Sequence, residues 1–398
     1  MFRLLPLALI ASISCAATVP SRVQERATTC TPTSGTSDDT LTIQSAIAQC
    51  PSGTIVIPAS TTYAINSALS FEGCSGCTLQ IEGTLKVSDD TDYWNGKSDV
   101  FTLDGITGAK IYSSTGTGVI DGNGQSSWDL FATDTSYDRP TLFSITGTSK
   151  NIIVQNLLFK NAPNVFHSAS SGTSNIQYID VTLSATSESS APAKNTDGWD
   201  VSGSYITIQG AKVTNDDDCV AFKPGANYVT VTDITCTGSH GLSVGSLGNK
   251  YGTTDTVSNI YVDGATMTDS GKAAGIKLYP AGADHGSAVV KNVTFANVVV
   301  DNSDYAFQIQ SCYNEDDAYC TATPSTGQLT DIVVKGFSGT TSTKYAPVVA
   351  NINCPEAGSC GLTMSEMTVK SGSGATAEYL CANTPSTVGV TCSSGADG

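Results

Sequence analysis

The feature that most restricts the fold is a short strand pattern that recurs along most of the chain. Each copy has alternating apolar residues, a turn and a second short strand, and Asn, Asp, Gly or Ser residues bound it. The copies begin at Asn151, Asn175, Tyr205, Tyr228, Asn259, Asn292 and Asp331. Their interval varies from the low twenties to the high thirties of residues, which is typical of a solenoid with loops of different length. The pattern predicts an all-β fold, a right-handed parallel β-helix forming one elongated domain.

Composition agrees with this fold and narrows the possible partners. Charged residues are 14% of the 398 residues, and helix-forming residues are sparse. The segment from Asp38 to Gln49 has helical spacing of its apolar residues and predicts a short helix that caps the N-terminal end. The net charge of −17 and the pI of about 4.3 argue against nucleic acid or an anionic membrane as a partner.

The N-terminus has the features of a secretory signal. Arg3 precedes the apolar run LLPLALIASI, and small residues follow, so residues 1–17 are predicted to be a signal peptide. The apolar run is too short to span a bilayer. Residues 18–26 are a candidate pro-segment, and residues 27–398 would form the β-helix. We expect a secreted, extracellular monomer with an N-glycosylation sequon at Asn292.

The cysteine count agrees with export. Thirteen cysteines less Cys15 of the signal leave an even twelve. Oxidising compartments favour local disulfides, and zinc binding is the competing interpretation of the Cys74-x-x-Cys77 spacing. The predicted pairs are Cys30 with Cys50, Cys74 with Cys77, Cys219 with Cys236, Cys312 with Cys320, Cys354 with Cys360, and Cys381 with Cys392.

Acidic residues and a histidine occur at coil spacing between residues 195 and 248. They are Asp197, the run Asp216 to Asp218, and His240 in a glycine-rich turn. If the coils stack in register, these side chains meet on one face, and mutual repulsion should raise the pKa of at least one carboxyl. A protonated acid facing an ionised one is what glycoside hydrolysis needs. A solvated turn and a calcium site are the alternatives for the Asp run. His167 and His285 are expected to be structural.

Four ordered stretches make the chain resemble the polygalacturonase family, glycoside hydrolase family 28. They are NTDGWD, NDDDC, GSHGLSVGSLG and GIKLYP, and the resemblance covers almost the whole mature chain. It implies a right-handed parallel β-helix that hydrolyses α-1,4 bonds of galacturonan-type pectin with inversion. It also implies that neither a metal nor another cofactor takes part.

The resemblance assigns roles to the carboxylates. Asp217 would be the general acid, and Asp197 and Asp218 would activate the attacking water. An inverting site separates acid and base by roughly 6.5–9.5 Å. Asp216 replaces a residue that is usually uncharged in the family, and we expect it to lie outside the chemistry. Asn195 would orient the first carboxylate, Asp197, or the sugar.

The resemblance also suggests residues that contact substrate. His240 would keep the acid protonated or position the sugar, and Lys277 would pair with a sugar carboxylate. Tyr305 would shape the subsite around the cleaved bond. Further lysines near the motifs are Lys194, Lys223, Lys250 and Lys272.

One departure from the family pattern concerns specificity. The third motif usually reads Arg-Ile-Lys, whereas this chain has Gly275-Ile276-Lys277. Glycine removes a bidentate cation and is expected to open a pocket for a branched sugar. This form, with TDYW at Thr91 to Trp94, most resembles the fungal xylogalacturonan hydrolases and implies endo action on xylose-substituted galacturonan.

Several other functions remain open at this point. Within the family the alternatives are an exo-polygalacturonase, because some exo-acting members also carry Ser before His-Gly, and, more weakly, a rhamnogalacturonan hydrolase. A calcium-dependent pectate lyase is an enzymatic alternative outside this mechanism. A β-helix that binds pectin without catalysis is the alternative from a different class, and the presence of all three acids argues against it.

Overall fold

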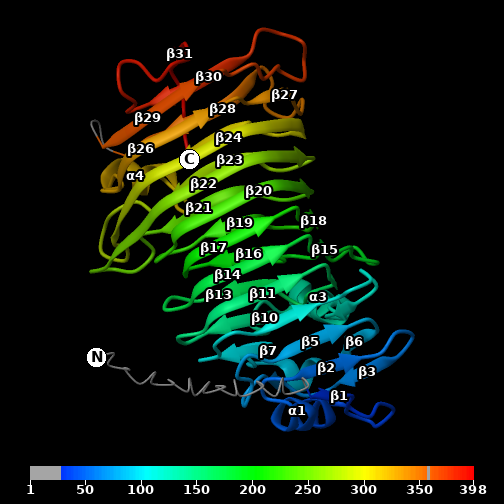
Figure 1. Cartoon of the computed structure of the whole chain (residues 1–398). Coiled ribbons are helices and arrows are strands. Elements are labelled where there is room, and N and C mark those ends of the chain that lie inside the picture. The colour runs from blue at the N-terminus through cyan, green and yellow to red at the C-terminus, as the bar shows by residue number, and fades with distance from the viewer. Residues whose placement is uncertain (1–27, 356–358) are drawn as a thin grey trace, which may run out of the picture.

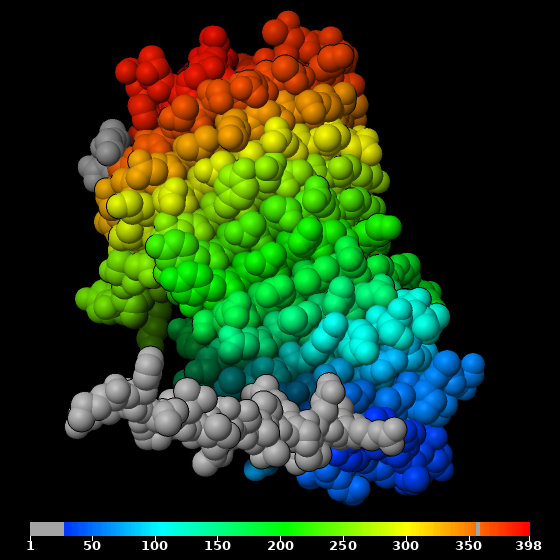
Figure 2. Space-filling model, viewed as in Figure 1, coloured from blue at the N-terminus to red at the C-terminus, as the bar shows by residue number. Residues whose placement is uncertain are grey.

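The computed structural model describes residues 28–355 and 359–398, which form a parallel β-helix of stacked coils (Figure 1). The coils follow one another from the N-terminal to the C-terminal end, so residues one coil apart in the sequence are neighbours in space (Figures 1 and 2). The predicted signal peptide and pro-segment lie outside the described residues. Among the described residues, no helix is long and apolar enough to cross a membrane.

One sheet of twelve parallel strands runs the length of the solenoid and carries the candidate site. In spatial order it contains β4 (Leu69–Ser70), β7 (Asp99–Asp104), β10 (Thr141–Thr146), β13 (His167–Ala169), β16 (Trp199–Val201), β19 (Asp218–Phe222), β21 (Gly241–Leu247), β23 (Ala274–Leu278), β25 (Phe307–Gln310), β28 (Val348–Asn353), β30 (Glu378–Ala382) and β31 (Cys392–Ser393).

The second sheet has nineteen strands in two parallel columns, which strands β20, β22 and β24 join because each runs through both. Its strands are β1 (Thr29–Cys30), β2 (Thr54–Ile57), β3 (Thr62–Ile65), β5 (Thr78–Ile81), β6 (Thr84–Val87), β8 (Lys110–Tyr112), β9 (Val119–Asp121), β11 (Lys150–Gln155), β12 (Leu158–Lys160), β14 (Ser174–Ile179), β15 (Thr182–Ser184), β17 (Ser204–Gln209), β18 (Lys212–Thr214), β20 (Asn227–Thr237), β22 (Thr254–Thr268), β24 (Ser287–Ser303), β26 (Gln328–Lys335), β27 (Ser338–Thr341) and β29 (Cys360–Ser365).

The first residue of each predicted repeat bends the coil at the same place. All seven have a positive φ between 54° and 58°, a conformation that Asn and Asp tolerate better than most residues. Their side chains stack: the Asn175 amide donates to Asn151 at 2.7 Å, and the Asn292 amide donates to Asn259 at 2.7 Å. Tyr205 and Tyr228 replace Asn in this column, and their rings stack with centroids 4.9 Å apart. The repeats read from the sequence are therefore successive coils.

Alternating apolar residues of the strands point inward and form one continuous core. Helix α1 (Thr40–Gln49) caps the N-terminal end, where Ile43 and Ile47 are fully buried, as predicted. The sequence did not predict α2 (Thr91–Trp94), α3 (Gln125–Thr133) or α4 (Asp317–Ala322). They lie in loops between coils and are too short to give a clear helical period.

All six predicted disulfides are present, and the Cys74–Cys77 bond excludes zinc ligation by that pair. Cys50 directly follows α1, is buried, and ties the end of this helix to Cys30 in β1. Cys236 is fully buried in β20 and joins this strand of the second sheet to Cys219 in β19 of the first. The other three bonds are Cys312–Cys320, Cys354–Cys360 and Cys381–Cys392.

Two of the histidines are structural, as expected. His167 is a core residue, packed between the rings of Phe159 and Trp199. Burial lowers the pKa of His167 to about 3, so it stays neutral. His285 is buried, stacks on Tyr279, and its Nε2 lies 3.1 Å from a Glu315 carboxylate oxygen.

Candidate active site

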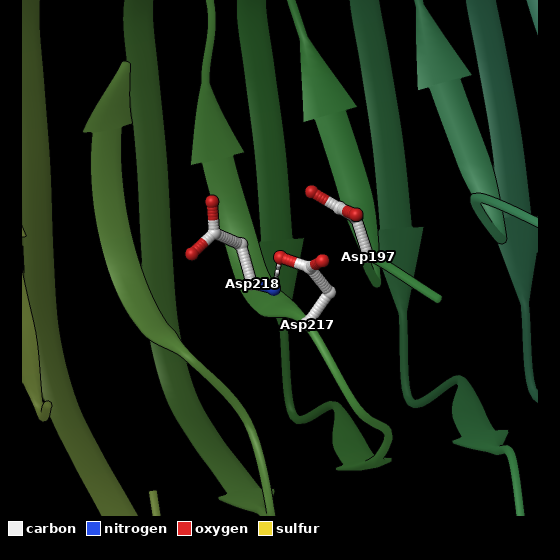
Figure 3. A group of neighbouring side chains, drawn as sticks. All are labelled: Asp197, Asp217 and Asp218. Carbon is white, nitrogen blue, oxygen red and sulfur yellow. Dashed lines mark hydrogen bonds between the residues drawn. The ribbon is translucent and has the colours of Figure 1, made fainter. Parts of the chain in front are cut away.

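Stacking of two neighbouring coils brings three carboxylates together. Asp197 lies just before β16, whereas Asp217 precedes β19 and Asp218 begins it. Strands β16 and β19 pair in parallel, and the amide of Gly198 donates to the carbonyl of Asp218 at 2.9 Å. One carboxylate oxygen from each acid lies within 4.8 Å of the others, and the side chains point into the same space (Figure 3).

This distance does not test the separation expected for an inverting site. The expected value of roughly 6.5–9.5 Å refers to whole carboxyl groups, whereas the 4.8 Å limit applies to one oxygen of each acid. The expected separation of acid and base therefore stays a prediction.

Asp218 is the acid most firmly held by the protein. It is 1% exposed and accepts hydrogen bonds from the Ser243 hydroxyl at 2.7 Å and the Lys277 ammonium at 2.6 Å. Both donors suit an ionised carboxylate. The charge of Asp218 in turn outweighs the effect of burial and raises the pKa of Lys277. Lys277 therefore stays a cation inside the site.

Asp217 lies between His240 and Asn195. Its Oδ1 is 3.1 Å from His240 Nδ1, and its Oδ2 accepts from the Asn195 amide at 3.1 Å. Burial opposes ionisation of Asp217, but the hydrogen bond and charge of His240 outweigh it and lower the pKa of Asp217 to about 2. The same hydrogen bond raises the pKa of His240. A proton shared by this pair therefore resides on His240.

Asp197 has the opposite balance. Burial and the charges of Asp200, Asp217 and Asp218 raise the pKa of Asp197 well above its ordinary value. Its nearest cation is Lys223, whose ammonium is 3.9 Å away. The raised pKa of Asp197 agrees with the expectation that clustered carboxylates favour a proton on one of them. The raised pKa belongs to Asp197, whereas the pKa of Asp217, to which the family resemblance assigns the acid role, is lowered by His240.

Two neighbouring cavities lie at the site, and the three acids line the larger one. The larger has a volume of about 580 Å³, and Asp197, Asp217 and Asp218 line it together with Phe131, Arg139, Lys223 and Tyr313. The smaller has a volume of about 310 Å³, and His240, Lys272, Lys277, Tyr305 and Tyr345 line it. Because Lys277 and Tyr313 border both, the two cavities form neighbouring parts of one face. An extended chain could pass over the acids from one cavity to the other.

Comparison with known proteins fits this geometry. The sequence pattern that describes glycosyl hydrolases family 28 matches residues 48–393. The chain belongs to glycosyl hydrolase family 28. It is therefore a glycoside hydrolase by family, and the family fold agrees with the observed one.

Individual family 28 members are close in sequence. A protein from Aspergillus flavus named as a probable endo-xylogalacturonan hydrolase A is 57% identical over 96% of this chain and 94% of its own. Endo-xylogalacturonan hydrolase A from Aspergillus tubingensis is 54% identical over 98% of each chain.

Solved structures agree on the fold. The crystal structure of endo-xylogalacturonan hydrolase from Aspergillus tubingensis superposes with a TM-score of 0.91 at 55% identity, covering 93% of this chain and 100% of that one. A polygalacturonase from Erwinia carotovora, at 22% identity, has a TM-score of 0.66 over 90% of this chain and 97% of its own, and supports the fold alone. The fold is the right-handed parallel β-helix of this family, as predicted.

The expectation that Gly275 opens a pocket is wrong. A Cβ built on Gly275 would lie 2.8 Å from Cδ and 2.9 Å from Cε of Lys272, and 2.5 Å from the Gln308 carbonyl. The stem of Lys272 fills the space that the missing side chain would take. Sequence spacing could not reveal this, because Lys272 enters from the loop before β23.

The other predicted site residues divide into two groups. Tyr305 lines the smaller cavity and stacks on Tyr345 with centroids 4.7 Å apart. Asn195 orients a carboxylate, as expected, but the carboxylate is that of Asp217 rather than Asp197. Asp216 and Lys250 line neither cavity, which agrees with the expectation that Asp216 lies outside the chemistry.

The disulfide cysteines lie outside the two cavities and act as supports. Cys50 and Cys236, although named among the candidate residues, are core residues 1% and 0% exposed and line neither cavity. Cys219 directly follows Asp218, and its bond to Cys236 fastens the strand that begins with this acid to the opposite sheet. The contribution of this disulfide to the site is therefore structural and not chemical.

Sequence reasoning missed Arg139, which fixes the geometry of Asn195. Its guanidinium donates to Asn195 Oδ1 at 2.8 Å and to the carbonyl of Lys194 at 2.6 Å, and lies 3.6 Å from the ring centre of Phe131. Because Arg139 holds the amide oxygen, the Asn195 amide nitrogen must face Asp217. The stretch around Arg139 has no motif, so its role depends on a contact 56 residues away in sequence.

Proposed function

We propose that this protein is a secreted endo-xylogalacturonan hydrolase, which cleaves α-1,4-galacturonosyl linkages of xylose-substituted galacturonan with inversion. The observation that carries the proposal is the convergence of Asp197, Asp217 and Asp218, one oxygen of each within 4.8 Å of the others, in the larger of two neighbouring cavities that lysines line. A pectic chain is a polyanion, so lysines on both sides of the acids suit it. The names of the relatives at 54–57% identity support the choice of substrate.

Asp217 would protonate the oxygen of the leaving sugar, with its proton drawn from His240. In the free site the pair is Asp217 carboxylate with protonated His240. A bound sugar would displace water from the exposed side of His240 and make two separated charges costly. Moving the proton from His240 to Asp217 removes both charges, so substrate binding would favour the protonated, reactive form of Asp217.

Water would attack the anomeric carbon from the side of Asp197 and Asp218. Asp218, held between Lys277 and Ser243, would accept a proton from that water as the new C–O bond forms. Protonated Asp197 could donate a hydrogen bond that fixes the water. As the glycosidic bond breaks, the proton of Asp217 goes to the leaving oxygen, so one proton is accepted and one delivered.

A xylose branch would be accommodated in the larger cavity rather than beside Gly275. That cavity, of about 580 Å³, is bordered by Phe131 and Tyr137, whose rings offer apolar faces to a sugar. The site also has reason to work without calcium. Lys277 lies 2.6 Å from Asp218 and Lys223 lies 3.9 Å from Asp197, so protein cations already offset the acids.

The test compares products from xylogalacturonan and from unsubstituted polygalacturonate, at mildly acidic pH with chelator present. We expect xylose-bearing oligomers from the first substrate, little product from the second, and a product whose anomeric configuration at the cut is inverted. Rapid release of galacturonic acid monomers from polygalacturonate would instead indicate an exo-polygalacturonase. Loss of turnover in chelator would favour a calcium-dependent lyase, and binding of both substrates without cleavage would favour a pectin-binding β-helix.

Export and glycosylation belong to the same proposal. Asn292 is exposed on the sheet away from the acids, which suits a glycan that does not obstruct the site. Removal of residues 1–17, a shift in mass on enzymatic deglycosylation, and elution as a monomer are the expected results for protein recovered from a culture medium.

A further inference from the structure

Lys272 has an unusual place for a lysine. It is 5% exposed, in the loop between β22 and β23, and its ammonium donates to the carbonyl of His240 at 2.9 Å. Its aliphatic stem crosses the face of Gly275. The ammonium therefore lies beside His240, and Lys272 forms part of the wall of the smaller cavity.

The cations around it have acidic partners, whereas Lys272 has none within 4.0 Å among the described residues. Lys277 pairs with Asp218 at 2.6 Å, Lys223 with Asp200 at 3.4 Å, and Lys344 with Asp304 at 2.7 Å. Burial, and then repulsion by Lys277, lower the pKa of Lys272 to about 8. At mildly acidic pH it is thus a buried cation that only the more distant charges of Asp217 and Asp218 offset, which is costly for a folded protein.

We propose that Lys272 binds the carboxylate of the galacturonate unit that occupies the smaller cavity, and so helps the enzyme to select an acidic sugar there. The inference rests on the proposed function, since it takes a galacturonan as substrate. It explains why an unpaired ammonium is kept at the cavity wall, because the substrate itself would supply the missing anion. A charge-assisted hydrogen bond in a partly dry site is stronger than one in water.

Gly275 makes this position of the Lys272 side chain possible. A side chain at position 275 would collide with the stem of Lys272, so glycine is what allows the lysine to lie across the strand. The family pattern provides a guanidinium at position 275, and here an ammonium reaches that volume from three residues earlier. One cation is exchanged for another with a different direction of approach, rather than lost.

The alternative role of Lys272 is purely structural, since its hydrogen bond also holds the His240 loop. Three variants separate the roles. Lys272→Met keeps the stem over Gly275 without the charge, and Lys272→Arg keeps a charge. Lys250→Met removes an exposed lysine that lines neither cavity and serves as the control. Dissociation constants are measured by calorimetry for a xylogalacturonan oligomer with free carboxylates and for its methyl ester.

We expect Lys272→Met to weaken binding of the free-acid oligomer by about ten- to hundredfold, the usual range for a hydrogen bond to a charged group, and to change ester binding little. Lys272→Arg should recover much of the preference for the acid, and Lys250→Met should change either constant less than about twofold. Because Lys272→Met removes an unpaired buried charge, its Tm should not fall, which guards against an unfolded variant.

Equal weakening of both oligomers by Lys272→Met, or unchanged binding of the acid, would overturn the inference and leave Lys272 as a support for the His240 loop. Turnover by the unmodified protein is measured separately. If it binds the acid oligomer through Lys272 but cleaves nothing, the proposed function fails and the carboxylate site stands. If it binds neither oligomer, both proposals fail.

Discussion

Two buried carboxylates in this molecule, Glu82 and Asp197, have opposite surroundings. Glu82, between β5 and β6, accepts six hydrogen bonds from Gln80, Ser113, Ser114 and Thr115. Against the effect of burial, these bonds lower the pKa of Glu82 strongly. Asp197, in the active site, has mainly other acids around it, and burial with their charges raises its pKa. The same functional group serves stability in one coil and reactivity in another.

The difference comes from what the neighbouring coil presents. Beside Glu82, the turn at residues 113–115 directs hydroxyls and backbone amides at the carboxylate, so its charge is satisfied locally. Beside Asp197, the neighbouring coil presents Asp217 and Asp218, so charge is concentrated and partner cations stand farther away. A satisfied carboxylate anchors a turn, whereas an unsatisfied one keeps a proton that chemistry can use.

The largest expected effect is a loss of activity on substitution of an active-site acid. Asp217→Asn should lower kcat on xylogalacturonan by about a thousandfold or more, since an amide cannot deliver a proton. Its Tm should fall modestly, because Asp217 accepts from the Asn195 amide and pairs with His240, but the variant should remain folded at the assay temperature. Initial rates of oligomer release and a thermal melt measure both. Retention of full activity would remove Asp217 from the proposed mechanism.

The second prediction concerns Glu82 and should give the opposite pattern. In Glu82→Gln the amide group must face the backbone N–H of either Ser114 or Thr115, which places donor against donor. The free energy of unfolding should fall by about 1–3 kcal/mol, measured as a lower urea midpoint.

Activity supplies the control, because Glu82 lies in the N-terminal coils, far along the solenoid from the acids (Figure 1). The kcat of Glu82→Gln should match that of the unmodified protein at a temperature where both are folded. If Glu82→Gln lost as much activity as Asp217→Asn, Glu82 would not serve stability alone, and the contrast with the active-site acids would be wrong.

The sequence predicted the fold well because each coil carries its own signal. Every repeat starts with a residue such as Asn151 or Asn259 whose backbone has a positive φ, so the turn is encoded locally. Cysteine spacing was equally informative, since Cys50 and Cys236 each lie about one coil step from their partners. The identities of the acids and of His240 were also accessible, because coil spacing and motif order bring them to one face.

What the sequence did not predict depends on contacts between distant side chains. Arg139 reaches Asn195 from another coil, and Lys272 fills the space beside Gly275 from a neighbouring loop. Which carboxyl has the raised pKa depends on such contacts as well, because Asp217 has His240 beside it, whereas Asp197 has other acids. Composition and spacing give the members of a charge cluster but not the sum of their fields.

The smallest expected effect is a difference in how Asp197 and Glu82 make stability depend on pH. Because the folded-state pKa of Asp197 is raised, its contribution to stability is complete below the unfolded pKa and is lost as pH rises through the folded pKa. Glu82 and Asp217 have lowered pKa values, so their contributions are present above the unfolded pKa and are lost as pH falls. Between mildly acidic and neutral pH, Asp197 therefore opposes the fold while the other two support it.

Asp197→Asn should remove that opposition, because an amide resembles the protonated acid at every pH. Relative to the unmodified protein, the free energy of unfolding of the variant should therefore rise as the pH is raised from mildly acidic to neutral. Asp200 also has a raised pKa and persists in both proteins, so the difference between their urea midpoints, and not either curve alone, isolates Asp197. A difference that shrinks as pH rises would show that Asp197 is ionised and supported like Glu82, and the contrast between the two regions would not hold.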